Sequence, residues 1–132
     1  MSTKVQYRKN VQISIIGSGY VGTTIAACFA DLGHDVINVD VDEEIVEMIN
    51  TGEPPIHEDG LAELVATHAG ADGTDRLRAT TDYRAVIETD VTFLCLPTPQ
   101  TEDGSIDLSI MEAGAEQLGA ALAEKPEWHT VI

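Results

Sequence analysis

Three glycines stand within six residues directly behind an apolar run, and this feature constrains the fold of the chain more than any other. They are Gly17, Gly19 and Gly22, in a Gly-x-Gly-x-x-Gly arrangement. The preceding residues 11–16 alternate and then run apolar, as a strand buried on both faces of a parallel sheet does. Residues 20–32 are rich in Ala, Ile, Cys and Phe and contain no proline. The pattern predicts a strand, a tight turn and a helix.

The rest of the chain alternates short apolar or β-branched runs with helical segments. Further strands are expected at residues 36–39, 76–81 and 91–96, and the final residues HTVI open another. Helices are expected after an N-cap at Asp42, at residues 61–70, 83–88 and 108–123, with Gly33 ending the first helix and Ser109 and Glu112 at capping-box spacing. This order predicts an α/β fold with a doubly wound parallel sheet, truncated near the fifth strand.

Length and charge limit the domain count and the partners. The 132 residues are enough for one domain: a polar N-terminal tail at residues 1–10 and a folded unit at 11–132. Seven Lys and Arg residues against 23 Asp and Glu residues give a net charge of −16, and residues 10–75 contain no cation. Nucleic acid is therefore excluded as a partner, because binding it needs a basic face. We interpret the acidic surface as an adaptation to concentrated salt, which screens self-repulsion.

The cysteines and histidines provide no metal site or disulfide scaffold. Cys28 and Cys95 each lie in an apolar segment, and we expect both to be buried thiols. The four histidines are scattered, without metal-ligand spacing. No apolar stretch reaches the roughly 20 residues that span a bilayer, and the N-terminus has no apolar leader core. We expect a soluble, cytoplasmic protein with no membrane partner.

The glycine pattern alone fits either a structural turn or a dinucleotide site. In the second case Gly17 permits the turn, Gly19 lets the backbone approach a pyrophosphate, and Gly22 lets helix and strand pack closely. Asp40 ends the second expected strand 18 residues after Gly22 (40 − 22 = 18). A carboxylate there can accept hydrogen bonds from the ribose of NAD while repelling the 2′-phosphate of NADP. Asp40 could instead cap a helix, but Asp42 already has that role, so we predict NAD as the cofactor.

Four stretches together resemble one protein family. GSGYVG, DLGHDVINVDVDEE, GEPPIHEDGLAELV and LPTPQTEDGSIDLS are similar, in this order, to the N-terminal NAD-binding domain of the UDP-glucose/GDP-mannose dehydrogenases. The resemblance covers residues 10–132, and the last stretch is its most specific part. It implies a Rossmann-type fold and, in the full-length enzyme, NAD-dependent oxidation of a UDP- or GDP-sugar alcohol to a carboxylate through a covalent thiohemiacetal.

The resemblance also implies roles for individual residues. The glycine loop, with Tyr20 and Val21 in its variable positions, would hold the pyrophosphate, and Asp40 would hold the adenosine ribose. The segment Leu96, Pro97 and Thr98 would lie against the cofactor, with the Thr98 hydroxyl contacting NAD. For Thr98 the alternative is a turn residue fixed between two prolines.

The chain departs from the family in three respects. Ile45 stands where many relatives have Lys or Arg, and the common EPGL stretch is replaced by residues 58–61, EDGL. Family members are considerably longer, and neither Cys28 nor Cys95 matches their nucleophile. We therefore expect a fragment that has no catalytic residues, binds NAD at best, and belongs to a homo-oligomer when full length.

Two other classes of protein share part of this pattern. NAD-sensing regulatory domains of potassium-transport systems also carry a glycine turn, a GHDV stretch and an aspartate. They lack the counterparts of PIHEDGLAELV and PTPQTEDGSIDLS, which disfavours this non-enzymatic alternative. A methyltransferase that binds S-adenosylmethionine is a weaker alternative, which Asp40 alone does not exclude.

Overall fold

A five-stranded parallel sheet forms the centre of the molecule in the computed structural model, which describes residues 11–132. The predicted polar tail at residues 1–10 lies outside the described residues. The strands are β1 (Gln12–Ile16), β2 (Asp35–Val39), β3 (Leu77–Thr80), β4 (Val91–Leu94) and β5 (Thr130–Val131). Their order in the sheet is β3-β2-β1-β4-β5, and every pair is parallel. The predicted doubly wound α/β fold is confirmed, including the strand expected at the end of the chain.

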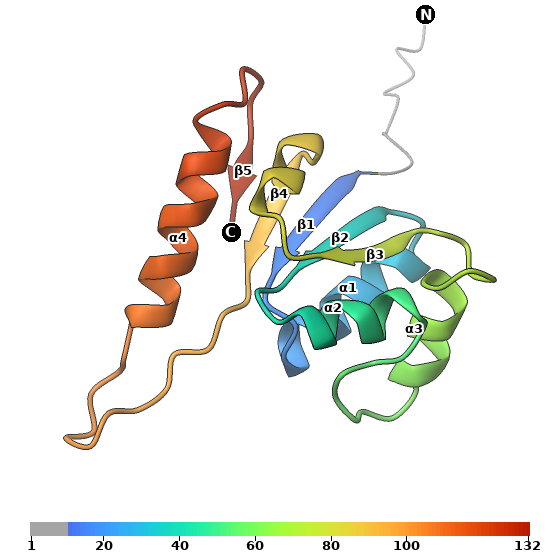
Figure 1. Ribbon diagram of the computed structural model, residues 1–132, viewed down its shortest axis with the longest axis horizontal. Helices are drawn as coiled ribbons and strands as arrows, with labels where there is room; N and C mark the ends of the chain where they lie inside the picture. The colour runs from blue at the N-terminus through green and yellow to red at the C-terminus, as the bar shows by residue number, and fades with distance from the viewer. Residues whose placement is uncertain (1–10) are drawn as a thin grey trace, which may run out of the picture.

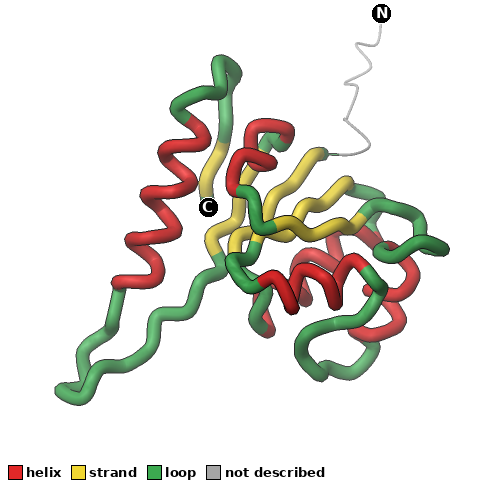
Figure 2. Tube along the Cα trace, in the orientation of Figure 1, coloured by secondary structure: helices red, strands yellow, loops and turns green. Residues whose placement is uncertain are grey.

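Helices cover both faces of this sheet. They are α1 (Tyr20–Asp31), α2 (Glu43–Asn50), α3 (Leu61–His68), the 3₁₀ helix η1 (Tyr83–Glu88) and α4 (Ser109–Leu122). Figure 1 shows α1, α2 and α3 on one side of the strands and α4 on the other. Strands β1, β2 and β3 are added toward one edge of the sheet, and β4 and β5 are added on the other side of β1 (Figure 2). The order of the strands therefore reverses between β1 and β4, which are neighbours in the sheet although far apart in sequence. Ligands bind at such a switch point in open α/β sheets, just beyond the carboxyl ends of the strands.

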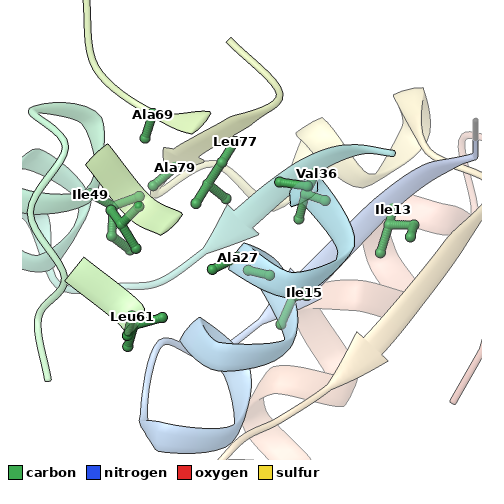
Figure 3. Packing of buried hydrophobic residues seen from close by; sticks show 12 residues of the cluster. Ile13, Ile15, Ala27, Val36, Ile49, Leu61, Ala69, Leu77 and Ala79 are labelled. Atoms are coloured by element: carbon green, nitrogen blue, oxygen red, sulfur yellow. The ribbon is translucent and has the colours of Figure 1, made fainter. Parts of the chain in front are cut away.

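The larger apolar cluster lies between the sheet and helices α1 to α3. Ile13 and Ile15 of β1 and Val36 of β2 face alanines of α1, and Ile49 of α2 closes the cluster near β3 (Figure 3). Alanines on the inner face of α1 bring the helix axis close to the strands, because they add little bulk between the two backbones. The position of α1 over β1 fixes where its N-terminus meets the sheet edge.

On the opposite face, a buried chain of hydroxyl groups accompanies the second apolar cluster. Ser14 Oγ lies 2.9 Å from Thr89 Oγ1 and 2.6 Å from Thr92 Oγ1, and Thr92 Oγ1 lies 2.7 Å from His129 Nε2. Lys125 Nζ lies 2.9 Å from His129 Nδ1. His129 Nδ1 also lies 3.1 Å from the Thr89 carbonyl oxygen, so this nitrogen has both a donor and an acceptor within reach. The polar side chains thereby tie β5 to β4 and β1 without leaving a buried group unpaired.

The helix ends confirm two predicted caps and correct a third. Gly33 has φ +97° and follows α1, where its N–H bonds the Ala30 carbonyl oxygen at 3.0 Å. The Asp42 carboxylate accepts from the Glu44 N–H at 3.0 Å and caps α2. The predicted capping box at Ser109 is wrong: Ser109 is the first residue of α4, and the Asp107 carboxylate accepts its N–H at 2.9 Å. The N-cap of α4 is Leu108, so the helix begins one residue earlier than a Ser109 cap would place it.

Two smaller expectations also change. The strand predicted at 91–96 ends at Leu94, although the Cys95 N–H still bonds the Ile16 carbonyl oxygen at 2.8 Å. Cys28 is exposed rather than buried, because it lies on the outer side of α1, and Cys95 is only partly buried. Over residues 11–132, no helix has the length and apolar character to cross a membrane.

Candidate functional site

A cleft of about 710 Å³ opens at the carboxyl ends of β1, β2 and β4. It lies where the turn after β1, the end of β2 and the loop after β4 converge. The residues that line it are Ser18, Gly19, Tyr20, Val21, Asp40, Ile45, Pro55, Ile56, Leu94, Cys95, Leu96 and Pro97. Six of the nine sequence-predicted cofactor residues are among them, while Gly17 precedes and Gly22 follows this stretch at the junction of β1 and α1. Thr98 is exposed and lies outside this lining.

The junction of β1 and α1 admits only glycine at two positions, one in the turn and one in the first turn of the helix. Gly17 has φ +102°, and a Cβ there would collide with the carbonyl oxygen of Cys95. Gly22 lies inside α1, and a Cβ there would collide with the carbonyl oxygen of Gly17. The first glycine therefore lets β1 turn beside β4, and the third lets α1 approach the strand end. Gly19 faces open space, as a backbone that receives a ligand requires.

The N-terminus of α1 is left open toward the cleft. Its N-cap is Gly19, which makes no side-chain hydrogen bond to the helix, and its first turn contains no acidic residue. By contrast, α2 is capped by Asp42 and carries two glutamates in its first turn. The first N–H groups of a helix lack partners within the helix and bear the positive end of its dipole. The open end of α1 is therefore suited to an anion such as a phosphate group.

Asp40 lines the same cleft, one residue beyond β2. Its backbone N–H bonds the Thr80 carbonyl oxygen at 3.1 Å, and its Oδ1 accepts from the Asp42 N–H at 2.9 Å. These bonds orient the carboxylate at the cleft wall and leave Oδ2 as an acceptor for a ligand hydroxyl. The negative charge also reaches Tyr83, because burial and the nearby Asp40 both raise the pKa of the Tyr83 hydroxyl.

Apolar side chains form the remaining walls. Ile45 of α2 stands with Pro55 and Ile56 near Asp40, and Leu96 and Pro97 lie on the β4 side. No Lys or Arg is among the lining residues, and the four cations of residues 11–132 contact other parts of the surface. An anionic ligand would thus depend on backbone amides alone for its charge compensation.

Buried polar residues under the turn were missed by the sequence analysis. Asn38 of β2, fully buried, donates to the carbonyl oxygens of Ile15 and Gly17 and accepts from Ser18 Oγ. Thr23 of α1 donates to the Ser18 carbonyl oxygen at 3.0 Å. A polar residue within the run DVINVD is itself a signal, because a strand buried on both faces tolerates an amide only when it is hydrogen-bonded.

The remaining candidate chemistry is limited. Burial raises the pKa of the Cys95 thiol, which favours its unreactive protonated form. Residues 11–132 contain no cluster of His, Cys, Asp or Glu side chains that could hold a metal ion.

A parallel sheet with a glycine turn, an uncapped helix N-terminus and an acidic residue after β2 defines a dinucleotide-binding domain of the Rossmann type. The open Gly19 and the unpaired amides fit a pyrophosphate, and Asp40 fits an unphosphorylated ribose. The chain belongs to the UDP-glucose/GDP-mannose dehydrogenase family, whose NAD-binding domain matches residues 11–132. Its cofactor is accordingly NAD.

Individual relatives agree with this assignment. The chain is 63% identical over 122 residues to the UDP-glucose 6-dehydrogenase AglM of Haloferax volcanii, covering 92% of this chain and 27% of that protein. It is 42% identical over 123 residues to the GDP-mannose 6-dehydrogenase of Pseudomonas aeruginosa, covering 92% of this chain and 28% of that protein. The chain therefore spans about a quarter of the length of these curated relatives.

Solved structures show the same fold. The UDP-glucose dehydrogenase of the archaeon Pyrobaculum islandicum superimposes with a TM-score of 0.85 at 38% identity, covering 96% of this chain and 29% of that one. A ternary complex of the Pseudomonas aeruginosa GDP-mannose dehydrogenase gives a TM-score of 0.85 at 43% identity, covering 90% and 27%. The regulatory-domain alternative gains no support from these comparisons.

Proposed function

We propose that this domain binds NAD for a nucleotide-sugar dehydrogenase of the UDP-glucose 6-dehydrogenase type. The 63% identity to a UDP-glucose 6-dehydrogenase supports UDP-glucose over GDP-mannose as the substrate of the longer protein. In that protein, NAD would accept hydride in two successive transfers, one NAD for each, while the sugar alcohol is oxidised to a carboxylate and water supplies the second oxygen. The chain alone binds the cofactor and does not oxidise the sugar, because Cys28 lies outside the cleft lining and burial raises the pKa of the Cys95 thiol.

The proposed pyrophosphate site is the turn formed by Gly17, Gly19 and Gly22. Here the backbone amides at the start of α1 supply hydrogen bonds and the helix dipole supplies positive potential. Tyr20 and Val21 are each 62% exposed and line the cleft, so they flank the phosphates and limit their access to water.

Asp40 is the residue that supports NAD rather than NADP as the cofactor. The Asp42 N–H holds the Asp40 carboxylate in the cleft lining, and in this proposal the carboxylate accepts hydrogen bonds from the hydroxyls of an adenosine ribose. A 2′-phosphate would meet this negative charge with no cation in the cleft lining to offset it. The domain should therefore discriminate against NADP.

The segment after β4 completes the proposed site. Leu96 and Pro97 form an apolar wall of the cleft, against which the nicotinamide half can lie. Proline restricts the backbone of this segment, so the wall is formed before the cofactor binds. Thr98 is proposed as a hydroxyl contact to NAD, which requires its exposed side chain to turn toward the cleft.

Calorimetric titration of the chain with NAD and NADP in molar KCl tests this function. NAD should bind measurably more tightly than NADP, and Asp40→Asn should weaken NAD binding about tenfold, the loss of one or two charge-assisted hydrogen bonds. Asp82→Asn is the matched control, because Asp82 also accepts a backbone N–H two residues on but lies outside the cleft. Failure of the unaltered chain to bind NAD, or equal binding of NADP, would refute the proposal.

A further inference from the structure

A fully buried amide and a buried hydroxyl hold the two carbonyl groups of the glycine turn. Asn38 Nδ2 donates to the Gly17 carbonyl oxygen at 2.9 Å and to the Ile15 carbonyl oxygen at 3.0 Å. Thr23 Oγ1 donates to the Ser18 carbonyl oxygen at 3.0 Å. Asn38 is 0% exposed and Thr23 is 1% exposed, so neither can reach a ligand itself.

The geometry of the peptide group converts these two bonds into a constraint on the next two N–H groups. A trans peptide directs its N–H opposite to its C=O, and residues 11–132 contain no cis peptide bond. Fixing the Gly17 carbonyl toward Asn38 therefore directs the Ser18 N–H away from the protein interior. Fixing the Ser18 carbonyl toward Thr23 does the same for the Gly19 N–H.

Those two N–H groups have no partner in the described part of the chain. The Gly17 N–H donates to the Val39 carbonyl oxygen and the Thr23 N–H donates to the Gly19 carbonyl oxygen. Among the described residues, neither the Ser18 nor the Gly19 N–H donates a hydrogen bond. Both residues line the cleft. Successive N–H groups that face the same concavity form an anion-binding nest.

The Asn38 side chain has a single orientation that satisfies all of its partners. Ser18 Oγ donates to Asn38 Oδ1 at 2.9 Å, so the oxygen faces Ser18 and the nitrogen faces the two carbonyl groups. The Gly17 N–H bonds the Val39 carbonyl oxygen at 2.8 Å, which holds the turn to the same strand. An aspartate at position 38 would set a carboxylate oxygen against two carbonyl oxygens in a site without water access.

We infer that Asn38 and Thr23 are positioning residues, which aim the Ser18 and Gly19 amides at the cofactor's pyrophosphate. The inference rests on the proposed NAD site and adds the residues that give it its shape. It predicts a loss confined to ligands that carry the pyrophosphate. The affinity for adenosine, which has a base and a ribose but no phosphate, should not depend on the orientation of the turn.

The test compares NAD with adenosine on the folded chain, by NMR titration in molar KCl. Asn38→Asp and Thr23→Val should each weaken NAD binding about tenfold or more, while adenosine affinity changes by less than about twofold. Asn50→Asp is the matched control: Asn50 also bridges backbone groups, at Ala79 of β3, but lies away from the cleft. It should lower stability without changing the affinity for either ligand.

Hydrogen exchange supplies a second readout that a merely structural role would not move. In the unaltered chain, NAD should slow exchange of the Ser18 and Gly19 amides, and in Thr23→Val this protection should be reduced. Thr23→Val keeps the side-chain volume and removes only the hydrogen bond to the Ser18 carbonyl oxygen. If Asn38→Asp does not fold, the inference can still be tested with Thr23→Val. If the folded variants bind NAD with unchanged affinity and unchanged protection of the Ser18 and Gly19 amides, the inference is overturned and the proposed function is not affected. No NAD binding by the unaltered chain would overturn the proposed function as well.

Discussion

Replacing Gly22 by alanine tests whether the close approach of α1 to the strand end governs this fold. Gly22 lies within α1 and its φ is not positive, so alanine suits its backbone conformation. In an ordinary helix interior the change to alanine stabilises by up to about 1 kcal/mol. Here the new Cβ would meet the Gly17 carbonyl oxygen, a backbone atom already held by Asn38.

The two opposing terms give the expected magnitude. Forcing an extra methyl group into a packed site costs about 1–3 kcal/mol, and the obstructing atom here cannot rotate away as a side chain can. The favourable helix term of up to about 1 kcal/mol offsets part of this cost. We expect Gly22→Ala to lower the free energy of unfolding by about 1–2 kcal/mol.

Gly119 provides the matched control in the same chain. It lies within α4, and a Cβ there would meet nothing within 4 Å. Gly119→Ala should raise the free energy of unfolding by about 0.5–1 kcal/mol. Urea unfolding at one fixed KCl concentration, followed by circular dichroism, measures both variants. The reasoning is refuted if Gly22→Ala is as stable as Gly119→Ala or more stable than the unaltered chain.

Three further predictions concern charge and protonation. Burial and Lys125 lower the pKa of His129, so on acidification the imidazole is protonated in the unfolded chain before it is protonated in the folded one. The free energy of unfolding should therefore fall between about pH 7 and pH 5.5, and it should fall less in His129→Gln. An equal fall in both chains in denaturant titrations would contradict this. The hydroxyl and backbone N–H of Ser105 and the Thr101 hydroxyl lower the pKa of Asp103 to about 2; Thr101→Val should raise it, as carboxyl NMR shifts over pH can establish. Because the net charge is −16, the thermal midpoint should rise from low salt to molar KCl, and a flat response would count against salt adaptation.

The first βαβ unit could be predicted because its signals are local. An apolar run, glycines and an alanine-rich segment each restrict the backbone where they stand, and Gly33 and Asp42 end or begin helices by their own conformations or side chains. The parallel order of the strands then follows from the alternation of strands and helices. The acidic residue after β2 was placed correctly at the cleft for the same reason.

The contacts under the turn could not be predicted, because they depend on which strands become neighbours. Asn38 meets the turn only when β2 pairs with β1 in the observed register, with Ile15 opposite Asn38. Cys28 was wrongly expected to be buried because its segment is apolar on average, whereas burial depends on the side of α1 that it occupies. At α4, the spacing of Ser109 and Glu112 suggested a capping box, but the N-cap is Leu108, and the Ser109 N–H donates to the Asp107 carboxylate.

The open N-terminus of α1 has a kinetic consequence. It offers the only concentrated positive potential in a cleft without cations, and its reach is short because the dipole's effect falls off within one turn. At greater distances the net charge of −16 repels a dinucleotide, which is itself an anion. Added salt shortens the range of that repulsion while leaving the contacts at the turn largely intact. Association with NAD should therefore become faster as ionic strength rises, the reverse of the usual behaviour of electrostatically steered pairs.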